Sequence, residues 1–375
     1  MKPGRIEPIS SGQFFLMVAV SVVAGGVYIW PSAVLAQAGM DAPWAIVLSI
    51  SLAMVLVWLQ TLWPPHVPGA SSLTRMQAVW GAVRWPIFMV TLALYLGLDG
   101  SLVALFSQML HVNFYARTPL WFFECSIVLV IGWMAAKSVS QVARNVQFWF
   151  PLIIASFFLL AAMALPHWHQ SAAIRPSSVI ALRPIAKALV STWYLWVQGE
   201  VIITLGAHVR TTSWPTIRLW ALGAILFQGF MLIVIYAMVV GTLGPNAPVD
   251  LQWPLPFIFS DLTISALVIS RPGLFILIAW VIALILYEAV TLMVLTTNLE
   301  DALGLGERAR TGMVWALILV LLGIASALSS PLKATHVVLA WIDPVALGLT
   351  LFTSILSPII WFTWRRHSTA AVTRR

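Results

Sequence analysis

A glycine pair interrupts the first long apolar run of this chain. The run covers about residues 12–37, more than the roughly 20 apolar residues that a helix needs to cross a membrane. Gly25 and Gly26 stand near its middle, and Pro31 follows. Glycine lets the backbone leave helical dihedral angles, and proline removes a hydrogen-bond donor. Because lipid offers no partner to a freed backbone group, we expect a broken helix that faces a protein-lined cavity. Close helix packing on small residues is the alternative.

The composition places most of the chain in lipid. Of its 375 residues, 61% are hydrophobic and only 9% are charged, whereas a soluble domain carries about 25% charged residues. The formal net charge of +8 does not indicate nucleic-acid binding, because most basic residues lie between apolar runs, where they orient the protein. The single cysteine, Cys125, excludes a disulfide within the chain. The sequence predicts an all-α integral membrane protein whose partner is the lipid bilayer and not a nucleic acid.

Hydropathy divides the sequence into ten candidate membrane spans. With the N-terminus in the cytoplasm, fourteen of the twenty Lys and Arg residues fall on the inner side, which predicts that both termini are cytoplasmic. Residues 71–84 are predicted to form a short amphipathic helix at the surface, and Pro254 to Ser270 a short interfacial helix. The ten spans cover about 12–37, 42–63, 86–110, 119–136, 146–165, 185–207, 216–243, 273–298, 312–329 and 336–363.

The ten spans form two equal sets of five, and an odd number makes the second set enter the membrane from the opposite side. We therefore predict one transmembrane domain over 1–375 with an inverted repeat, in which repeat one covers about 12–165 and repeat two about 185–363. The first helix of the second set carries Gly199 and Glu200 at mid-span, the pattern expected of a second break. Interrupted helices at matching places in two inverted halves are typical of a transporter-type binding site.

The backbone at the two breaks predicts the class of ligand. A half-helix that starts near Val27 directs free N–H groups and its positive end toward the gap, which suits a carboxylate. Half-helices that end near Ala24 and Gln198 offer unpaired carbonyl groups, which suit an ammonium group or a small cation. One small zwitterion satisfies both sets, so an α-amino acid is the predicted ligand.

Polar side chains inside the spans are further candidates, because a charge at mid-membrane is costly and is by default functional. Glu200 is expected to receive the ligand amine, carry a proton or hold the unwound segment; a purely structural cap is the alternative. Tyr95 and Asp99 lie four residues apart, on one face of the third span. Tyr95 and Asp99 line the gap between the two breaks if that face of the span meets the gap. The alternative is that both are buried between helices, with Asp99 protonated.

The eighth span offers a second polar face. Tyr287 and Thr291 form a stripe, whereas Glu288 points about 100° away, so we expect the stripe rather than Glu288 to face the site. Glu124 is given no role, and Asp343 is interpreted as a capping acid at a kink. The predicted ligand-binding residues are Ala24, Gly25, Gly26, Val27, Tyr95, Asp99, Trp196, Gln198, Gly199, Glu200, Tyr287 and Thr291.

Enzymatic motifs are missing from the sequence. The seven histidines are scattered, and the only near pair, His167 and His169, lies in a predicted loop. Neither a phosphate-binding loop nor a nucleophile elbow with Ser-His-Asp order occurs. We therefore expect a protein that is not an enzyme and that has no catalytic residues, cofactor or metal site.

Four motifs carry a resemblance to a known family. They are Ile9-Ser-Ser-Gly-Gln13-Phe-Phe, Gly25-Gly26 followed by Trp30-Pro31, Ala36-Gln-Ala-Gly39 leading to Asp41-Ala42, and Gly199-Glu200. With them the chain resembles the B subunits of spore-germination nutrient receptors, which belong to the amino acid–polyamine–organocation superfamily. The resemblance implies the leucine-transporter fold with helices 1 and 6 broken. It also implies that residues of the two breaks hold the ligand, with Tyr95 and Tyr287 on the walls.

The same resemblance implies a function and partners. It predicts an amino-acid sensor in the inner spore membrane that works with an A subunit and a C subunit. The chain departs from the family in its many tryptophans and in carrying Asp99 and Glu288. The alternative function is a stand-alone proton-coupled amino-acid transporter, in which Glu200, Asp99 or Glu288 carries protons. A membrane scaffold with a vestigial cavity is a third possibility.

Overall fold

Helices form the regular structure of this chain, as the hydropathy predicts. The computed structural model describes residues 8–24, 26–62, 70–178, 180–210, 213–261, 273–328 and 330–372, and the elements within these ranges are helical. In lipid each backbone polar group needs a partner inside the protein, and a helix supplies nearly all of them within one segment.

Seven of the described helices are long and apolar enough to cross a membrane, or eight when one bent pair is counted as a single span. Two shorter apolar helices, α1 (Ser11–Ala24) and α6 (Leu120–Ala135), accompany them. The turn η1 (Gly39–Asp41) joins α2 (Trp30–Ala38) directly to α3 (Ala42–Gln60), so this stretch counts once instead of contributing to two spans. The multi-span helical fold is confirmed, whereas the count of ten spans is not.

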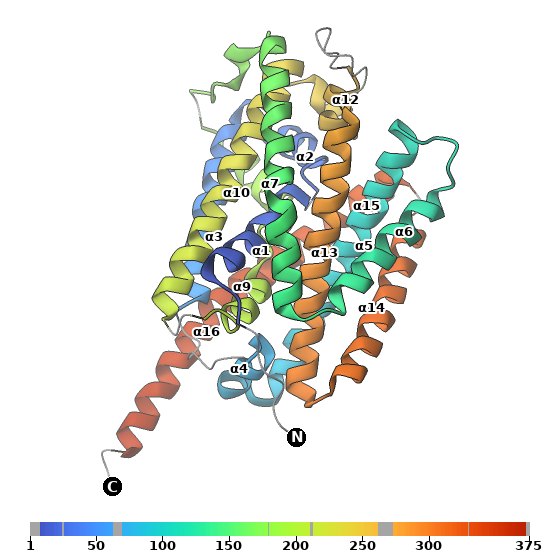
Figure 1. The fold of residues 1–375 in the computed structure, drawn as a ribbon. Helices are drawn as coiled ribbons and strands as arrows, with labels where there is room; N and C mark the ends of the chain where they lie inside the picture. Colours follow the sequence, from blue (N-terminus) through green and yellow to red (C-terminus); the bar gives the residue numbers. More distant parts are fainter. Residues whose placement is uncertain are drawn as a thin grey trace.

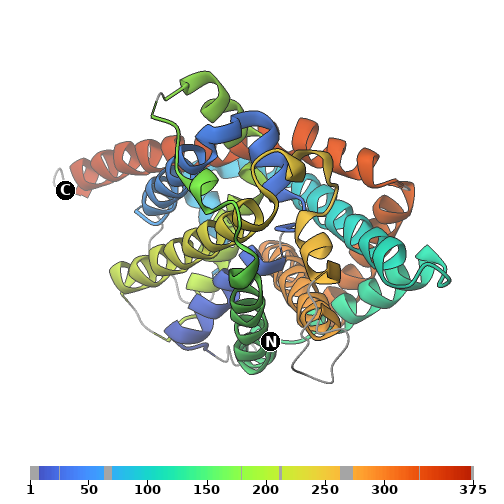
Figure 2. The same cartoon turned by 90° about the horizontal axis from the view of Figure 1, so that it is seen from above.

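The helix α13 (Gly273–Leu303) lies at the middle of the bundle. It packs against α1, α6, α7 (Val139–Ala164) and α14 (Glu307–Ala327), and Figure 2 shows it beside the green α7. The outer helices turn apolar side chains outward: Leu319 of α14 is 69% exposed. Exposed large apolar side chains on several outer helices are what a surface that faces lipid requires.

Helix α10 (Trp214–Leu243) packs between α1 and α3, and α5 (Arg84–Asn113) packs against α6 and α14. The half-helices α2 and α8 (Leu182–Val190) pack together. The remaining elements are α4 (Ser72–Trp80), η2 (Gly81–Val83), η3 (Leu165–His167), η4 (Ser171–Ile174), η5 (Trp193–Trp196), α9 (Gly199–Gly206), α11 (Ala247–Asp250), α12 (Pro254–Asp261), α15 (Pro331–His336), η6 (Val337–Ile342) and α16 (Asp343–Val372).

The two ends of the bundle differ. Figure 1 shows α4 and both chain termini at one end, α12 at the other, and α16 extending beyond the bundle. Of the predicted interfacial helix, the structure describes Pro254–Asp261 as α12; residues 262–272 lie outside the described ranges.

The helix α4 is a buried element rather than a surface helix. The side chains of Leu73 and Met76 are buried. The backbone N–H of Ser71 donates to the Asp301 carboxylate at 2.8 Å, and the N–H of Leu73 donates to the side-chain oxygen of Asn298 at 2.8 Å. These bonds fix α4 to the end of α13, so the prediction of a surface helix over 71–84 is wrong for this part of it.

The residues before α1 are tied to the loop after α9. The backbone N–H of Ile9 donates to the His208 carbonyl at 2.9 Å, and the N–H of Arg210 donates to the Ile9 carbonyl at 3.0 Å. This short parallel bridge buries Ile9 completely. It holds the start of α1 next to the segment that follows the end of α9.

Candidate functional site

The first break separates α1 from α2. Helix α1 ends at Ala24, and Gly26 has a φ of 81°, a left-handed conformation that side-chain-bearing residues rarely adopt. The backbone N–H of Trp30 donates to the Gly26 carbonyl at 3.2 Å and closes a tight turn. Gly25 lies outside the described residues. The predicted break is confirmed, although α2 begins at Trp30 and not at Val27.

The second break is longer than predicted. The helix α8 ends at Val190, η5 follows, and α9 begins at Gly199; the axis bends by 60° between the two halves. The prediction that the upper half-helix ends near Gln198 is therefore wrong, because Gln198 is the residue that precedes the first turn of α9. The residues of η5 are apolar and aromatic, so their sequence carries no signal for unwinding.

Tyr194 connects the two breaks. Its hydroxyl donates to the Gly26 carbonyl at 3.0 Å, and both groups are buried. A Cβ atom on Gly26 would lie 2.9 Å from Leu102 Cδ2 and 3.0 Å from Tyr194 Cε2. Side chains therefore fill the junction, and the carbonyls of Gly26 and Val197 accept side-chain hydroxyl groups rather than standing unpaired as predicted.

Two side chains from other helices hold the unwound second break. The Asp343 carboxylate accepts the backbone N–H of Tyr194, and the Tyr95 hydroxyl donates to the Val197 carbonyl at 3.0 Å. Asp343 directly follows the wide π-helical turn η6. The sequence predicts that Asp343 caps a kink in its own span, but the hydrogen bond of its carboxylate goes instead to the unwound segment of the second break.

A pair of glutamine amides joins α9 to α1 and α10. Gln198 and Gln228 donate to each other's side-chain oxygens at 3.0 Å. Gln228 also donates to the Val18 carbonyl at 2.7 Å and to the Ser21 hydroxyl at 2.8 Å. Gln198 thus binds neighbouring helices instead of an open gap. Sequence reasoning missed Gln228, although an amide inside the apolar α10 was a usable signal.

Replacing Gln228 by leucine is expected to lower the free energy of unfolding by about 2 to 4 kcal/mol, because a carbonyl and an amide then lose partners in a buried site. Thermal melting of the purified protein in detergent measures this loss. The control is Gln147→Leu, which removes an amide from an exposed pair with Gln13 and should change the melting temperature little. Equal melting temperatures for both variants would contradict a structural role for the buried pair.

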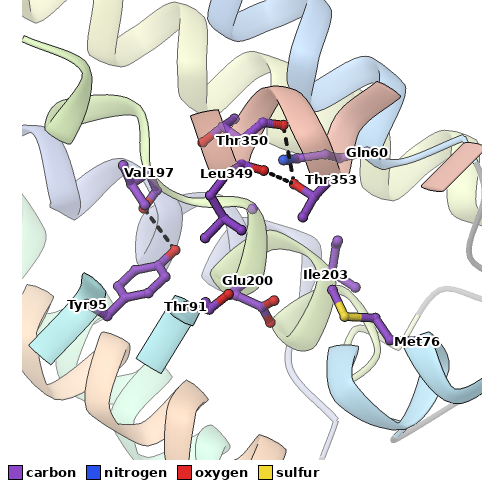
Figure 3. A pocket seen from close by; sticks show the side chains of 11 residues that line it. Gln60, Met76, Thr91, Tyr95, Val197, Glu200, Ile203, Leu349, Thr350 and Thr353 are labelled. Atoms are coloured by element: carbon purple, nitrogen blue, oxygen red, sulfur yellow. Dashed lines mark hydrogen bonds between the residues drawn. The ribbon is translucent and has the colours of Figure 1, made fainter. Parts of the chain in front are cut away.

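A small cavity with both polar and apolar lining residues adjoins the start of α9 (Figure 3). Its volume of about 30 Å³ accommodates one or two water molecules, so in this state it is too small for an amino acid. A Cβ atom on Gly199 would lie 2.8 Å from the Gln60 amide, which explains the glycine there. The polar lining comes from Gln60, Thr91, Tyr95, Glu200, Thr350 and Thr353.

Glu200 lies in the first turn of α9, at the edge of this cavity. The Ser72 hydroxyl of α4 lies beside its carboxyl group. The Oε2 atom of Glu200 is buried and has no hydrogen-bond partner among the described residues. Tyr95 and Asp343, not Glu200, hold the unwound backbone, so the carboxyl group of Glu200 stays available for a ligand or a proton.

Asp99 and Glu288 meet where α5 contacts α13. Both side chains are fully buried, and their carboxyl groups lie within hydrogen-bond range of each other. Tyr287 borders the same two carboxyl groups. Tyr287 and Glu288 thus both border Asp99, and neither of them lines the cavity beside Glu200. The Thr291 hydroxyl donates to the Tyr287 carbonyl at 3.1 Å, within its own helix.

The predicted site residues thus occupy neighbouring places rather than one pocket. Gly26 and Val27 form the junction, Tyr95, Gly199 and Glu200 border the cavity, and Asp99 lies with Glu288 behind them. Trp196 lies on another side, in a shallow depression with Trp30 of α2 and Leu232 of α10. Over the described ranges, no three His, Cys, Asp or Glu side chains gather where they could hold a metal ion.

The two broken helices around a buried junction define the leucine-transporter fold. The chain is similar to MhsT, solved in complex with L-phenylalanine, with a TM-score of 0.63 and 15% identity over 96% of this chain and 99% of that one. It is also similar to a Na⁺-coupled sialic acid symporter in a substrate-bound outward-open state, with a TM-score of 0.66 and 12% identity over 93% and 79% of the two chains.

Sequence comparison gives the family. Residues 8–335 match the model of the spore permease family of spore germination proteins. The chain therefore belongs to this family. A relative is the spore germination protein YndE of Bacillus subtilis (strain 168), which is 21% identical over 285 residues, or 74% of this chain and 76% of YndE. The fold and the family together define a multi-pass membrane protein of the permease type.

Proposed function

We propose that this chain is the membrane subunit of a spore germinant receptor. In this proposal it binds a small nutrient, an α-amino acid, between its two broken helices and signals germination with an A subunit and a C subunit. Membership in the spore germination family supports the biological role. The likeness of the fold to a protein solved with L-phenylalanine supports a small zwitterion as the ligand.

The hydrogen bond from the Tyr194 hydroxyl to the Gly26 carbonyl carries the proposal. It marks the point where both unwound segments meet and where a buried carbonyl accepts a donor that can be exchanged. A ligand ammonium group would take the place of this hydroxyl and lie on the side of Glu200. The ligand carboxylate would lie at the start of α2, which has no side-chain cap, because the positive end of a helix dipole suits an anion.

Titration of the purified full-length protein with the set of amino acids tests ligand binding. We expect at least one of them to raise the melting temperature, because a ligand at a hundred times its Kd stabilises a protein by about 2.7 kcal/mol. Tyr194→Phe should bind the same amino acid about fivefold more tightly, since it removes a competing hydrogen bond of about 1 kcal/mol.

Tyr236→Phe is the matched control for this titration. Tyr236 is also buried, and its hydroxyl has no partner among the described residues, so the affinity should stay at the wild-type value. Silence across the amino-acid set in a folded sample would contradict the proposal. Co-purification with the A and C subunits tests the receptor assembly separately.

A stand-alone proton-coupled transporter is the second candidate, favoured by the meeting of two buried acids, Asp99 and Glu288, beside the junction. Proteoliposomes that contain only this chain distinguish the two functions. Robust amino-acid uptake driven by a pH gradient supports the transporter. Binding without uptake supports the receptor subunit.

A further inference from the structure

The carboxyl groups of Asp99 and Glu288 are buried without a hydrogen-bond donor from the described residues around them. The two side chains come from α5 and α13, and neither has any exposed surface. Within the described part of the chain, none of their four carboxyl oxygens receives a hydrogen bond from an N–H or hydroxyl donor. Buried polar atoms in proteins nearly always have a hydrogen-bond partner. Four such oxygens without a partner at one point indicate that a hydrogen atom bound to one of them supplies the missing hydrogen bond.

The surroundings supply no positive charge. The titratable groups that interact with the pair are Tyr28 at the first break, Tyr95 on α5 and Tyr287 on α13, and all three are neutral donors or acceptors. Among the described residues the neighbouring helices do not change this balance. Arg144 of α7 is exposed, Glu200 of α9 lies at the cavity, and Arg75 of α4 interacts with Asp301 and lies over the Trp214 ring. Helix α1 has no titratable residue, Glu124 of α6 accepts a hydrogen bond from Ser326, and Arg310 of α14 pairs with Glu300.

Two facing carboxylates in this place would repel each other and would both be desolvated. Such a pair does not ionise twice at neutral pH, because each charge penalises the other in a medium of low dielectric constant. At least one positive charge, a proton or a bound cation, must therefore accompany the two carboxyl groups. The groups are within hydrogen-bond range of each other, and among the described residues no third His, Cys, Asp or Glu side chain joins them to hold a metal ion, so a proton is the charge that fits.

We propose that Asp99 and Glu288 form a binding site for a proton, in which one carboxylic acid donates its O–H to the carboxylate of the other. Release of the proton leaves two facing carboxylates, and uptake of a second proton makes the pair neutral. The site lies between Tyr28, which belongs to the first break, and Tyr95, which holds the second break at Val197. Its charge therefore acts on both broken helices. The assignment stands whether or not the chain binds an amino acid.

The dependence of thermal stability on pH tests the site in the purified full-length protein. At neutral pH the folded pair retains a proton that the carboxyl groups of the unfolded chain have already released, so stability falls as the pH rises. We expect the unfolding equilibrium to change up to about tenfold per pH unit, which moves the melting temperature by several degrees between about pH 6 and about pH 9. Asp99→Asn and Glu288→Gln should each flatten this dependence, because the new amide donates permanently to the remaining carboxylate.

Controls separate this result from other causes. Asp250→Asn removes an exposed acid and should keep the wild-type dependence. If the amide variants do not fold, the double variant D99L/E288L removes both carboxyl groups together and should also give a flat profile. In infrared spectra at neutral pH, the double variant D99N/E288Q should lose a deuterium-sensitive band of a protonated carboxyl group that the wild type shows.

Three outcomes would overturn the assignment. The first is an unchanged pH dependence in the folded variants that lack one or both carboxyl groups. The second is an infrared spectrum in which the double variant loses no protonated-carboxyl band. The third is a melting temperature that responds to Na⁺ or K⁺ at constant pH in the wild type but not in the variants, because the site would then hold a metal cation.

Discussion

Replacing Gly26 by alanine is expected to destabilise the protein by about 2 to 5 kcal/mol and to abolish nutrient binding. The first cause is the φ of 81°, which penalises any residue with a side chain. The second is space: the new Cβ would lie 2.9 Å from Leu102 Cδ2 and 3.0 Å from a ring carbon of Tyr194. Either the turn opens or Tyr194 moves, and each change separates the two breaks.

Thermal melting and amino-acid titration of the purified variant measure both effects. Gly223→Ala is the matched control, because Gly223 lies inside helix α10 and a Cβ there meets only Phe15 at an ordinary 3.8 Å. Alanine is the better helix former, so this variant should keep or slightly raise the melting temperature. A Gly26→Ala protein with wild-type stability and binding would show that the junction has no part in ligand recognition.

The largest effect on function is expected from Glu200→Gln. This change should abolish the response of spores to the nutrient and weaken ligand binding about thirtyfold or more, which corresponds to 2 kcal/mol or more for a buried charge that loses its partner. The fold should survive, because the backbone of the second break is held by Tyr95 and Asp343. The Ser72 hydroxyl lies beside this side chain, and the oxygen of glutamine accepts a hydroxyl donor just as a carboxylate oxygen does.

Germination assays with spores and binding assays with the purified chain should rank the wild type and its variants in the same order. Glu124→Gln provides the comparison, since Glu124 is a buried acid of another span whose partner is Ser326; it should respond like the wild type. If Glu200→Gln spores germinate normally, the charge of Glu200 is not used and its role is confined to the first turn of α9.

The sequence allowed both breaks to be located, but it did not show which side chains hold and fill them. Glycine marks the left-handed turn at Gly26 and the close approach of Gln60 to Gly199, because both are local demands on one backbone position. The unwinding from Val190 to Gln198 depends on the bond to Asp343, which lies far away in the chain. Local patterns of hydropathy do not contain such a contact.

The acids show the same limit. The spacing of Tyr95 and Asp99 predicted a common face of one helix, yet which face meets which neighbour depends on the packing of the whole bundle. Glu288 therefore pairs with Asp99 although its position relative to Tyr287 argued against it. Gln228 received no role, because an amide in an apolar helix has a meaning only when its partners are known.

The bridge between Ile9 and the segment 208–210 has a mechanical consequence. Opening the protein at the α4 end by swinging α1 away must break two backbone hydrogen bonds and expose a fully enclosed isoleucine, which together cost about 3 to 6 kcal/mol. The leading residues thus act as a latch. Any change that draws Ile9 out of the bridge would therefore free α1 to move.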